Sequence, residues 1–426
     1  MALNPNQAAA GHNQAAGLDQ AAGSSGAALD LPALIQSRRP GFALERRFYT
    51  DPAIFERDMQ SMLLKHWFCA GHASSIARGG EYLIVDLGAE SVIVVRTAAG
   101  DVRALLNVCR HRGSRICAGR SGRAASARLT CPYHAWTYDL DGNLIAARQM
   151  PDSFRRSDMG LKTLPVRIVE GLIFITFAEH PLDFTGAEEA LIRSAGVHGW
   201  ARAKVAHREL YSINANWKLA VENYMECYHC QPAHPEYAKR HVYARPAEMN
   251  EEIERAARRR AEVLGVVVPD IDRYGCAAGP GQESSAVMRS ALYEGLASAT
   301  ADGRPVGRLM GAFSASDGNS TYFDIGPLSD FLAYPDHGVI YRFIPRAVDR
   351  TEMEVLWLVD ENAVEGTDYD VERLTWLWTT TSAEDKRIVE MNQAGVGSRF
   401  FEPGPYSLQE TYADRFVSWY LQELSN

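Results

Sequence analysis

Two short motifs in the first half of the chain, each with one cysteine and one histidine, constrain the fold more than any other feature. The first is Cys109-Arg-His111, and the second, Cys131-Pro-Tyr-His134, begins after nineteen intervening residues. Thiolate and imidazole side chains suit zinc and iron–sulfur centres. Short β-rich runs surround both motifs, so we expect them on loops that project from a small sheet. The spacing therefore predicts two adjacent loops that hold one metal centre.

The order of the ligands distinguishes the two kinds of centre. A zinc finger usually pairs Cys with Cys and His with His along the chain, whereas here each loop supplies one Cys and one His. In a Rieske [2Fe–2S] cluster, both thiolates bind one iron and both imidazoles bind the other. The alternating order favours the cluster over structural zinc. Cys117 lies between the motifs, and we expect it to be a small buried side chain.

A second pair of histidines, His229 and His234, follows a stretch with helical spacing. Side chains five residues apart lie about 140° apart on a regular helix, so these two converge only if the helix is interrupted. Pro232 and Pro235 provide such an interruption. Two imidazoles and one carboxylate form the usual face of a non-haem Fe(II) site with open positions for O₂. The pattern predicts a second, mononuclear iron site.

Together these motifs resemble the Rieske non-haem iron oxygenase family. The likeness extends to Asn107-Val-Cys109-Arg-His111-Arg-Gly-Ser and to Cys131-Pro-Tyr-His134-Ala-Trp136, with one departure at Ala135, where the family often has Gly. The resemblance implies an α+β fold class: an N-terminal all-β Rieske domain, then an α+β, helix-grip-like catalytic domain with an antiparallel sheet. It also implies two cofactors, a Rieske [2Fe–2S] cluster and mononuclear Fe(II).

The resemblance assigns the remaining metal-site residues. Ser382-Ala-Glu384-Asp385 with Glu390 and Gln393 is similar to a late family segment that supplies the third iron ligand, which points to Asp385. Glu384 is adjacent, and spacing alone leaves both open. Glu226 matches the acid that joins the iron site of one subunit to a cluster histidine of the next, by resemblance His229 and His134. The plain alternative for Glu226 is a surface glutamate on a helix.

Cys227-Tyr-His-Cys230 has the spacing of a Cys-x-x-Cys motif for zinc or thiol–disulfide exchange. That interpretation explains neither the nearby acids nor the upstream cluster motifs. We therefore expect both cysteines to pack around the histidine helix. Seven cysteines, an odd number, argue against a secreted disulfide framework and favour metal ligation in a reducing cytoplasm.

Composition shifts divide the chain into three parts. Residues 1–29 are rich in Ala, Gly, Gln and Asn and are expected to be a disordered tail. Residues 30–180 form an N-terminal helix, expected over 45–70, and the Rieske domain. Residues 181–426 form the catalytic domain, with an exposed helix over 248–262 and one or two long helices over 367–394. A net charge of −9 argues against nucleic-acid binding, and no long apolar run predicts a membrane helix.

The wider resemblance is to the branch that oxidises glycine betaine, proline betaine and carnitine. It implies a monooxygenase that hydroxylates an N-methyl group of a quaternary amine, which then releases formaldehyde. An oxygenase that hydroxylates an aromatic or alicyclic substrate is the alternative. A homotrimer is implied, and so is a separate flavin and ferredoxin-type reductase using NAD(P)H, because Gly395-Val-Gly397 lacks the full dinucleotide fingerprint.

A quaternary ammonium group has no N–H to donate in a hydrogen bond, so aromatic faces must recognise it, each contributing about 0.5–2 kcal/mol. The candidates are Tyr322, Phe323, Phe331 and Tyr334, although aromatic side chains in strands more often belong to the core. Arg342 is the candidate partner for a betaine carboxylate.

Overall fold

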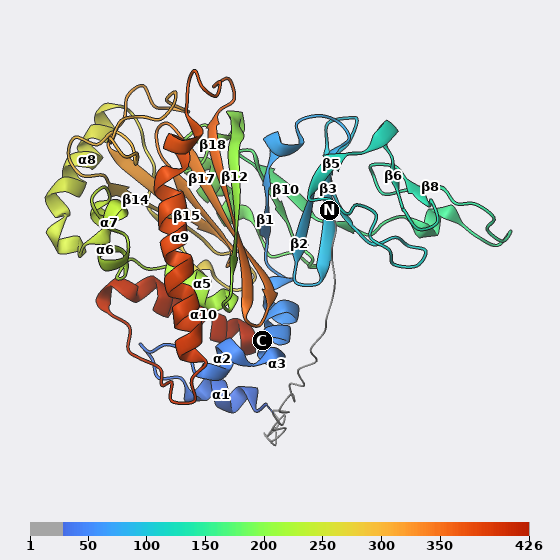
Figure 1. The fold of residues 1–426 in the computed structure, drawn as a ribbon, viewed down its shortest axis with the longest axis horizontal. Helices are drawn as coiled ribbons and strands as arrows, with labels where there is room; N and C mark the ends of the chain where they lie inside the picture. The colour runs from blue at the N-terminus through green and yellow to red at the C-terminus, as the bar shows by residue number, and fades with distance from the viewer. Residues whose placement is uncertain (1–28, 426) are drawn as a thin grey trace, which may run out of the picture.

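The computed structural model describes residues 29–425, so the predicted tail lies outside the described residues except for Leu29. The chain forms two lobes that lie side by side along its longest axis (Figure 1). One lobe is built from short strands and carries the Cys/His loops. The other contains a large antiparallel sheet with helices packed on it. The α+β class with a β-rich first part is thereby confirmed.

The β-rich lobe contains two antiparallel sheets in the order β5-β2-β3-β4-β9 and β6-β7-β8. Branched apolar side chains stabilise the first sheet. In the run EYLIVDL every second side chain from Leu83 onward is buried, and in SVIVVR all side chains except the final Arg are buried. The strands are β2 (Glu81–Leu87), β3 (Glu90–Arg96), β4 (Val102–Leu106), β5 (Ser121–Arg123), β6 (Leu129–Thr130), β7 (Thr137–Tyr138), β8 (Leu144–Ala146) and β9 (Thr163–Leu164). Asp141 and Gly142 lie in the hairpin turn between β7 and β8.

The other lobe is organised by a seven-stranded antiparallel sheet in the order β12-β18-β17-β16-β15-β14-β13. Its strands are β12 (Ala203–Ile213), β13 (Ile271–Arg273), β14 (Ser285–Ala291), β15 (Asn319–Ile325), β16 (Ser329–Ala333), β17 (Gly338–Ala347) and β18 (Arg350–Asp360). Because successive side chains of a strand point to opposite faces, the sheet has one hydrophobic core on each face. Val355 and Trp357 face the helices, whereas Leu356 and Leu358 face the opposite layer.

Helices cover one face of this sheet, and α9 (Val371–Val396) is a single long helix that runs across it (Figure 1). Around it lie α5 (Trp217–Tyr224), α6 (Cys230–Ala233), α7 (Pro235–Ala238) and α10 (Thr411–Ser425), with α8 (Glu251–Val263) at the periphery. The opposite face packs against α4 (Thr185–Arg193) and a small sheet of β1 (Phe68–His72), β11 (Leu172–Ile175) and β10 (Val166–Val169).

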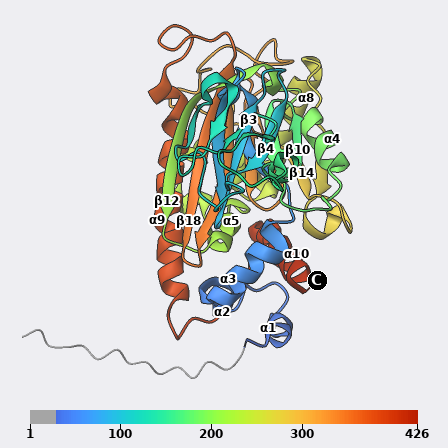
Figure 2. The same ribbon diagram turned by 90° about the vertical axis from the view of Figure 1, so that its right-hand side faces the viewer.

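The N-terminal helices α1 (Leu31–Ser37), α2 (Arg46–Thr50) and α3 (Pro52–Asp58) pack below the large sheet, next to α10 (Figure 2). The buried carboxylate of Asp58 attaches them there. It accepts hydrogen bonds from Trp217 Nε1 at 3.1 Å and Tyr420 OH at 2.7 Å, and it forms an ion pair with Lys218. The first helices therefore contact the iron-site helix α5 through its first turn.

The helix expected over 45–70 is shorter than predicted. It is divided at Asp51 into α2 and α3. Asp51 caps α3, since its side chain accepts from the Ala53 amide, and Pro52 is the first residue of α3. Helix α3 continues through a π-helical turn over Met59–Leu63 and then ends. Residues Phe68–His72 form strand β1 instead, because they pair with the apolar strand β11. Within residues 29–425 no helix is long and apolar enough to cross a bilayer.

Candidate metal centres

The two Cys/His loops lie side by side at the tip of the β-rich lobe. One joins β4 to β5 and the other joins β6 to β7. Cys109 and Cys131 are both buried, whereas His111 is exposed and His134 half-buried. The two imidazole centroids are 4.7 Å apart. The loops thus place two thiols inside and two imidazoles toward solvent, the division that a cluster with one thiolate-bound and one imidazole-bound iron requires.

Both loops use the same backbone pattern. The Gly113 amide donates to the Cys109 carbonyl at 2.9 Å, and the Ala135 amide donates to the Cys131 carbonyl at 3.0 Å. Tyr138 supports the first loop from β7, since its hydroxyl lies 3.4 Å from Cys109 Sγ and accepts from the Arg110 amide. Each cysteine therefore sits at the start of a tight turn that backbone hydrogen bonds stabilise.

Ala135, the departure from the family pattern, has a φ of +58°. That left-handed conformation costs a residue with a Cβ atom roughly 1–2 kcal/mol, whereas glycine adopts it freely. The loop keeps the shape that glycine would allow, at the expense of local strain.

Cys117 is buried, as expected, in the core beneath the first loop. Its backbone is held by Asn107, whose side chain accepts from the Ile116 and Cys117 amides at 2.9 Å each and donates to the Cys117 carbonyl. Cys117 therefore belongs to the support of the loop.

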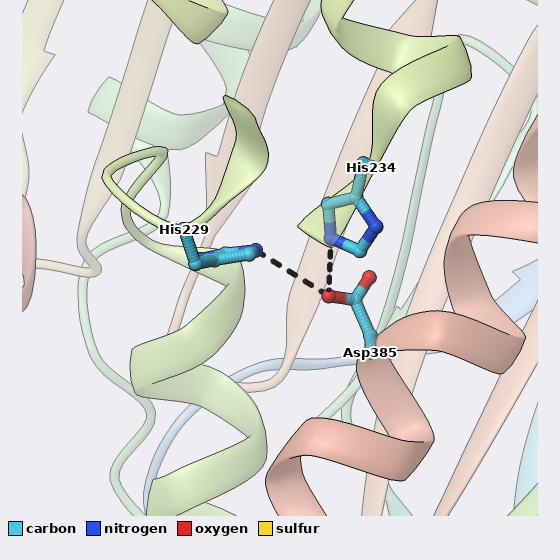
Figure 3. Close-up of side chains that lie close together, drawn as sticks. All are labelled: His229, His234 and Asp385. Carbon is cyan, nitrogen blue, oxygen red and sulfur yellow. Dashed lines mark hydrogen bonds and ion pairs between the residues drawn. The ribbon is translucent and has the colours of Figure 1, made fainter. Parts of the chain in front are cut away.

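The second group of predicted ligands converges between α6, α7 and α9. Asp385 Oδ1 lies 2.9 Å from His234 Nε2 and 3.4 Å from His229 Nε2 (Figure 3). Within the described residues, one ligand atom from each of these three side chains falls within 4.8 Å of the others. Two imidazole nitrogens and one carboxylate oxygen directed at one point are the donor set of a non-haem Fe(II) site. The three residues fit that ion.

An interruption of the helix brings the two histidines together. Helix α5 ends at Tyr224, and α6 begins after His229 and ends at Ala233. His234 has a non-helical backbone (φ −124°, ψ 72°), as the residue before a proline often does, and α7 begins at Pro235. The two rings meet nearly perpendicular, with centroids 5.0 Å apart. The turn at His234 thus corrects the divergence that a continuous helix would impose.

Glu384 and Asp385 occupy different positions around His234. Asp385 faces Nε2, next to His229, while Glu384 Oε2 lies 2.8 Å from Nδ1 on the other side of the ring. A carboxylate on the second nitrogen of a metal-binding imidazole fixes its orientation and tautomer. The geometry groups Asp385 with the two histidines and makes Glu384 the support of His234.

Acidic groups surround both imidazoles. Burial lowers the pKa of His229, but hydrogen bonds with Asp385 and Glu226 outweigh it and raise the value to about 9. Burial raises the pKa of Asp385, yet its hydrogen bonds with both histidines hold that pKa below the ordinary value. Glu226 pairs with His229 Nδ1, the nitrogen that faces away from Asp385. The site therefore favours an added positive charge, which a divalent metal supplies.

Two polar residues of α9 hold the chain that enters the histidine segment. Gln393 Oε1 accepts from the Asn216 amide at 2.7 Å, and Glu390 Oε1 accepts from the Asn214 amide at 2.9 Å. Asn216 in turn caps α5, since its Oδ1 accepts from the Lys218 amide. The late motif thus fastens α9, which carries Asp385, to the start of the segment that carries the histidines.

A cavity opens beside these three side chains, between the helices and the large sheet. Among the predicted substrate residues, Tyr322 and Phe331 border it. The Phe331 ring stacks on Phe323 at 4.9 Å on the far side of the sheet, because the two residues are cross-strand partners. Phe323 therefore belongs to the opposite core.

The other two substrate candidates lie elsewhere in the core. Tyr334 is fully buried, and its hydroxyl bonds to His241 Nε2 at 2.8 Å. Arg342 is buried in an ion pair with Glu354 and lies over the Phe68 ring, so it is not available to a substrate carboxylate in the cavity.

Sequence patterns had not pointed to most of the cavity wall. It contains aromatic residues from five segments, and two acids from adjacent strands: Tyr224, Tyr237, Tyr243, Trp378, Tyr412, Asp324 and Asp330. The only sequence signal for the acids is their place inside otherwise apolar strands, at Tyr322-Phe-Asp324 and Asp330-Phe-Leu.

Cys227 and Cys230 also border the cavity and are joined by a disulfide bond. We expected two thiols packed around the histidine segment, so the bond is a correction. The turn after α5 brings the two residues together, with Cα atoms 4.8 Å apart. The disulfide closes a short loop that contains His229.

Comparisons with known proteins agree with this arrangement. Residues 66–165 match the family described as "Rieske [2Fe-2S] domain", and residues 200–426 match "Ring hydroxylating alpha subunit (catalytic domain)". The glycine betaine monooxygenase oxygenase subunit of Pseudomonas aeruginosa is 35% identical over 92% of this chain and 91% of its own length. The subunit of that name from Chromohalobacter salexigens is 35% identical over 92% of this chain and 88% of its own.

Solved structures share the fold. The crystal structure of the quaternary ammonium Rieske monooxygenase CntA in complex with L-carnitine has a TM-score of 0.66 and 23% identity, covering 92% of this chain and 96% of that one. A naphthalene 1,2-dioxygenase structure bound to phenanthrene has a TM-score of 0.65 and 19% identity, covering 91% and 93%. At these identities the likeness concerns the fold alone.

Proposed function

The chain belongs to the Rieske non-haem iron oxygenase family, and from this premise we propose that it hydroxylates an N-methyl group of a quaternary ammonium compound. It is an oxidoreductase that carries a Rieske [2Fe–2S] cluster and mononuclear iron. Hydroxylation of the methyl carbon uses O₂, two electrons and two protons and releases water. The resulting carbinolamine breaks down to formaldehyde and the demethylated amine.

The observation that carries this proposal is the likeness to glycine betaine monooxygenase oxygenase subunits, which spans 92% of the chain and therefore both metal regions. The cavity supports it independently. Its wall presents aromatic residues from several elements, and aromatic faces attract a quaternary ammonium group without hydrogen bonds.

We assign the residues of the two centres as follows. Cys109, His111, Cys131 and His134 hold the cluster, and His229, His234 and Asp385 hold the iron. Bound there, the cluster supplies single electrons and the iron activates O₂. Glu384 fixes the His234 ring through Nδ1, and Glu226 does the same for His229. The apolar and aromatic cavity wall orients the methyl group and limits the access of water.

The shape of the chain supports electron transfer between subunits. The cluster loops and the helices α6 and α7 lie at opposite ends of the longest axis (Figure 1), so the cluster of one copy would serve the iron of another. A surface depression beside His229, bordered by Glu226 and Asn223, would receive it. Glu226 would then join His229 to His134 of the neighbouring copy.

Exposed apolar side chains near both metal sites support a head-to-tail assembly, which by the family resemblance we propose to be a ring of three subunits. Exposed Val108 and Tyr133 flank the cluster ligands, and exposed Met391, Phe400 and Leu408 lie in segments that border the depression or adjoin its lining residues. Two different apolar surfaces on one chain give a head-to-tail contact, which closes into a ring when the rotation allows.

Electrons come from a separate reductase that oxidises NAD(P)H, because the chain has no complete dinucleotide fingerprint. A flavin and ferredoxin-type protein meets that need, and the supply of NAD(P)H places the pair in the cytoplasm.

The test is formaldehyde release with a reductase of this type, NADH and a panel of quaternary amines. Formaldehyde formed in step with NADH oxidation, and absent without the oxygenase, is the expected result. A product that keeps every methyl group and gains a hydroxyl on an aromatic or alicyclic ring would replace the proposal with ring hydroxylation.

A further inference from the structure

Two acidic residues form a cross-strand pair on the cavity floor. Asp324 on β15 lies directly opposite Asp330 on β16, and both border the cavity. Directly opposed side chains have Cβ atoms about 5 Å apart, and like charges in such a pair destabilise a sheet. Since strand alternation turns both carboxyl groups to the iron side, the fold has placed two acids together within reach of a substrate.

Among residues 29–425, no cationic side chain forms an ion pair with either carboxyl group. Asp330 is 2% exposed, and its Oδ2 has no hydrogen-bond partner in the described structure. Burial raises the pKa of Asp324 to about 6. Burial and the nearby Asp324 charge raise the pKa of Asp330 well above its ordinary value. Both shifts reflect the cost of ionising two adjacent buried carboxyl groups, a cost that a bound cation would lower.

Other buried acids of the same fold have partners. Three of them form ion pairs with cationic side chains: Asp58 with Lys218, Asp317 with Arg289, and Glu354 with Arg342. Asp336 accepts from Ser298 and lies beside His337. An acid left without a partner in a cavity is costly unless a ligand supplies the positive charge. Asp324 and Asp330, the pair without a cationic partner, therefore lie where a substrate would bind.

Aromatic residues line the same cavity as the pair. Tyr224, Tyr243 and Tyr412 border it together with both carboxyl groups. A carboxylate beneath aromatic faces attracts a cation that has no hydrogen to donate.

Apart from the proposed iron, the cavity offers no full positive charge for the other end of a substrate. Among the described residues that border it, none is Lys or Arg, and its two histidines are the proposed iron ligands. A zwitterionic substrate would place its carboxylate in an acidic cavity whose wall has no cationic side chain to pair with it.

We propose that Asp324 and Asp330 form the binding site for the cationic head and select quaternary ammonium compounds whose remaining part is uncharged over zwitterionic betaines. This inference rests on the proposed function, because it names the charge class of the substrate of that same site. It replaces the role first expected of Arg342, which is buried in its own ion pair.

Three molecules of similar shape test the proposal: glycine betaine, its amide, which carries one positive charge, and 3,3-dimethylbutanamide, which is neutral. Calorimetry with the iron- and cluster-loaded protein measures the Kd of each. We expect the amide to bind at least tenfold more tightly than the other two. Glycine betaine binding as tightly as its amide would overturn the charge selection.

Variants then test the pair itself. In Asp324→Asn/Asp330→Asn, the Kd of the amide should rise at least tenfold, while that of the neutral molecule stays within about twofold. Glu365→Gln, which removes an exposed carboxyl outside the cavity, is the matched control. The visible spectrum of the cluster checks folding, and the single variant Asp324→Asn serves if the double variant is unstable. An unchanged Kd for the amide in a folded variant would overturn the proposal.

The assay separates this inference from the proposed function. Pair-dependent binding of the amide without formaldehyde from any quaternary amine would reject the function and keep the binding site. Formaldehyde release that is equally fast in the double variant would reject the binding site and keep the function.

Discussion

Glu384 lies 2.8 Å from Nδ1 of His234, the nitrogen directed away from the point at which His229, His234 and Asp385 meet. Two neighbouring acids of α9 thus contact opposite nitrogens of one ring. Asp385→Ala should abolish binding of the mononuclear iron, because it removes one of three ligands, and should leave the cluster spectrum intact. Glu384→Gln should keep the iron but lower its affinity about 10- to 100-fold, as loss of an imidazole support does.

Iron content and chelator competition measure both variants, with the visible absorption of the cluster as internal control. Full iron content in Asp385→Ala together with an iron-free Glu384→Gln would show that Glu384 is the iron ligand and Asp385 the support of His234.

Glu226→Gln tests the link between the centres. The glutamine still reaches His229 Nδ1 but carries no charge, so we expect iron to remain bound. Turnover should fall about 10- to 100-fold, since a charged acceptor shared by two imidazoles is lost. Single-turnover oxidation of the reduced cluster, followed by its absorbance, measures the transfer step directly. Cluster oxidation at the wild-type rate would reduce Glu226 to a local support of His229.

Ala135→Gly tests strain in the second cluster loop. At a φ of +58° glycine is free of the steric cost that alanine bears, so the variant should be more stable by about 1 kcal/mol. Urea unfolding of the cluster-loaded protein measures the change. The reduction potential serves as the control, because the ligands and their hydrogen bonds are unchanged. A variant less stable than the wild type would show that the loop is not strained.

The sequence predicted best what lies close together along the chain. Both Cys/His loops and the interrupted histidine segment depend on short spacings, and the structure has each of these at the expected place. The helix over 45–70 was predicted too long, because the pairing of Phe68–His72 with β11 involves residues about a hundred positions away.

The rest of the site depends on rotation and register that spacing does not specify. Adjacent acids at 384 and 385 differ in role only because α9 presents them at different angles to His234. Tyr322 and Phe323 are adjacent in one strand, yet only Tyr322 faces the iron side, and the meeting of Asp324 with Asp330 requires the exact register of β15 and β16. Such contacts arise only when the strands pair in the folded sheet, so spacing along the sequence does not predict them.

Three buried histidines predict a stability loss in mild acid. Burial lowers the pKa of His72 to about 4 and those of His198 and His241 to about 3. In the unfolded chain these rings titrate near about 6.5. The unfolded state therefore binds more protons below that pH, and the free energy of unfolding falls as the pH drops from about 6.5 toward 4. Each ring contributes up to about 1.4 kcal/mol per pH unit.

Urea unfolding at a series of pH values measures this slope. His198→Gln should flatten it by about one proton, since the amide can still donate to the Tyr334 carbonyl and accept from Thr321. Asn362→Ala, at an exposed residue that does not titrate in this pH range, is the control and should keep the wild-type slope. Equal slopes in wild type and His198→Gln would show that His198 does not take part.

We expect the disulfide beside His229 to slow the loss of iron from the site. Cys227→Ala/Cys230→Ala opens the loop that holds this ligand between its two ends, so we expect faster loss of iron to a chelator. The effect on global stability should be small, about 2 kcal/mol or less, because the closed loop is short. Alkylation of the unfolded protein followed by mass spectrometry should label five cysteines before reduction and seven after it. Seven labelled cysteines without reductant would show that the bond does not form, and the double variant should then release iron at the wild-type rate.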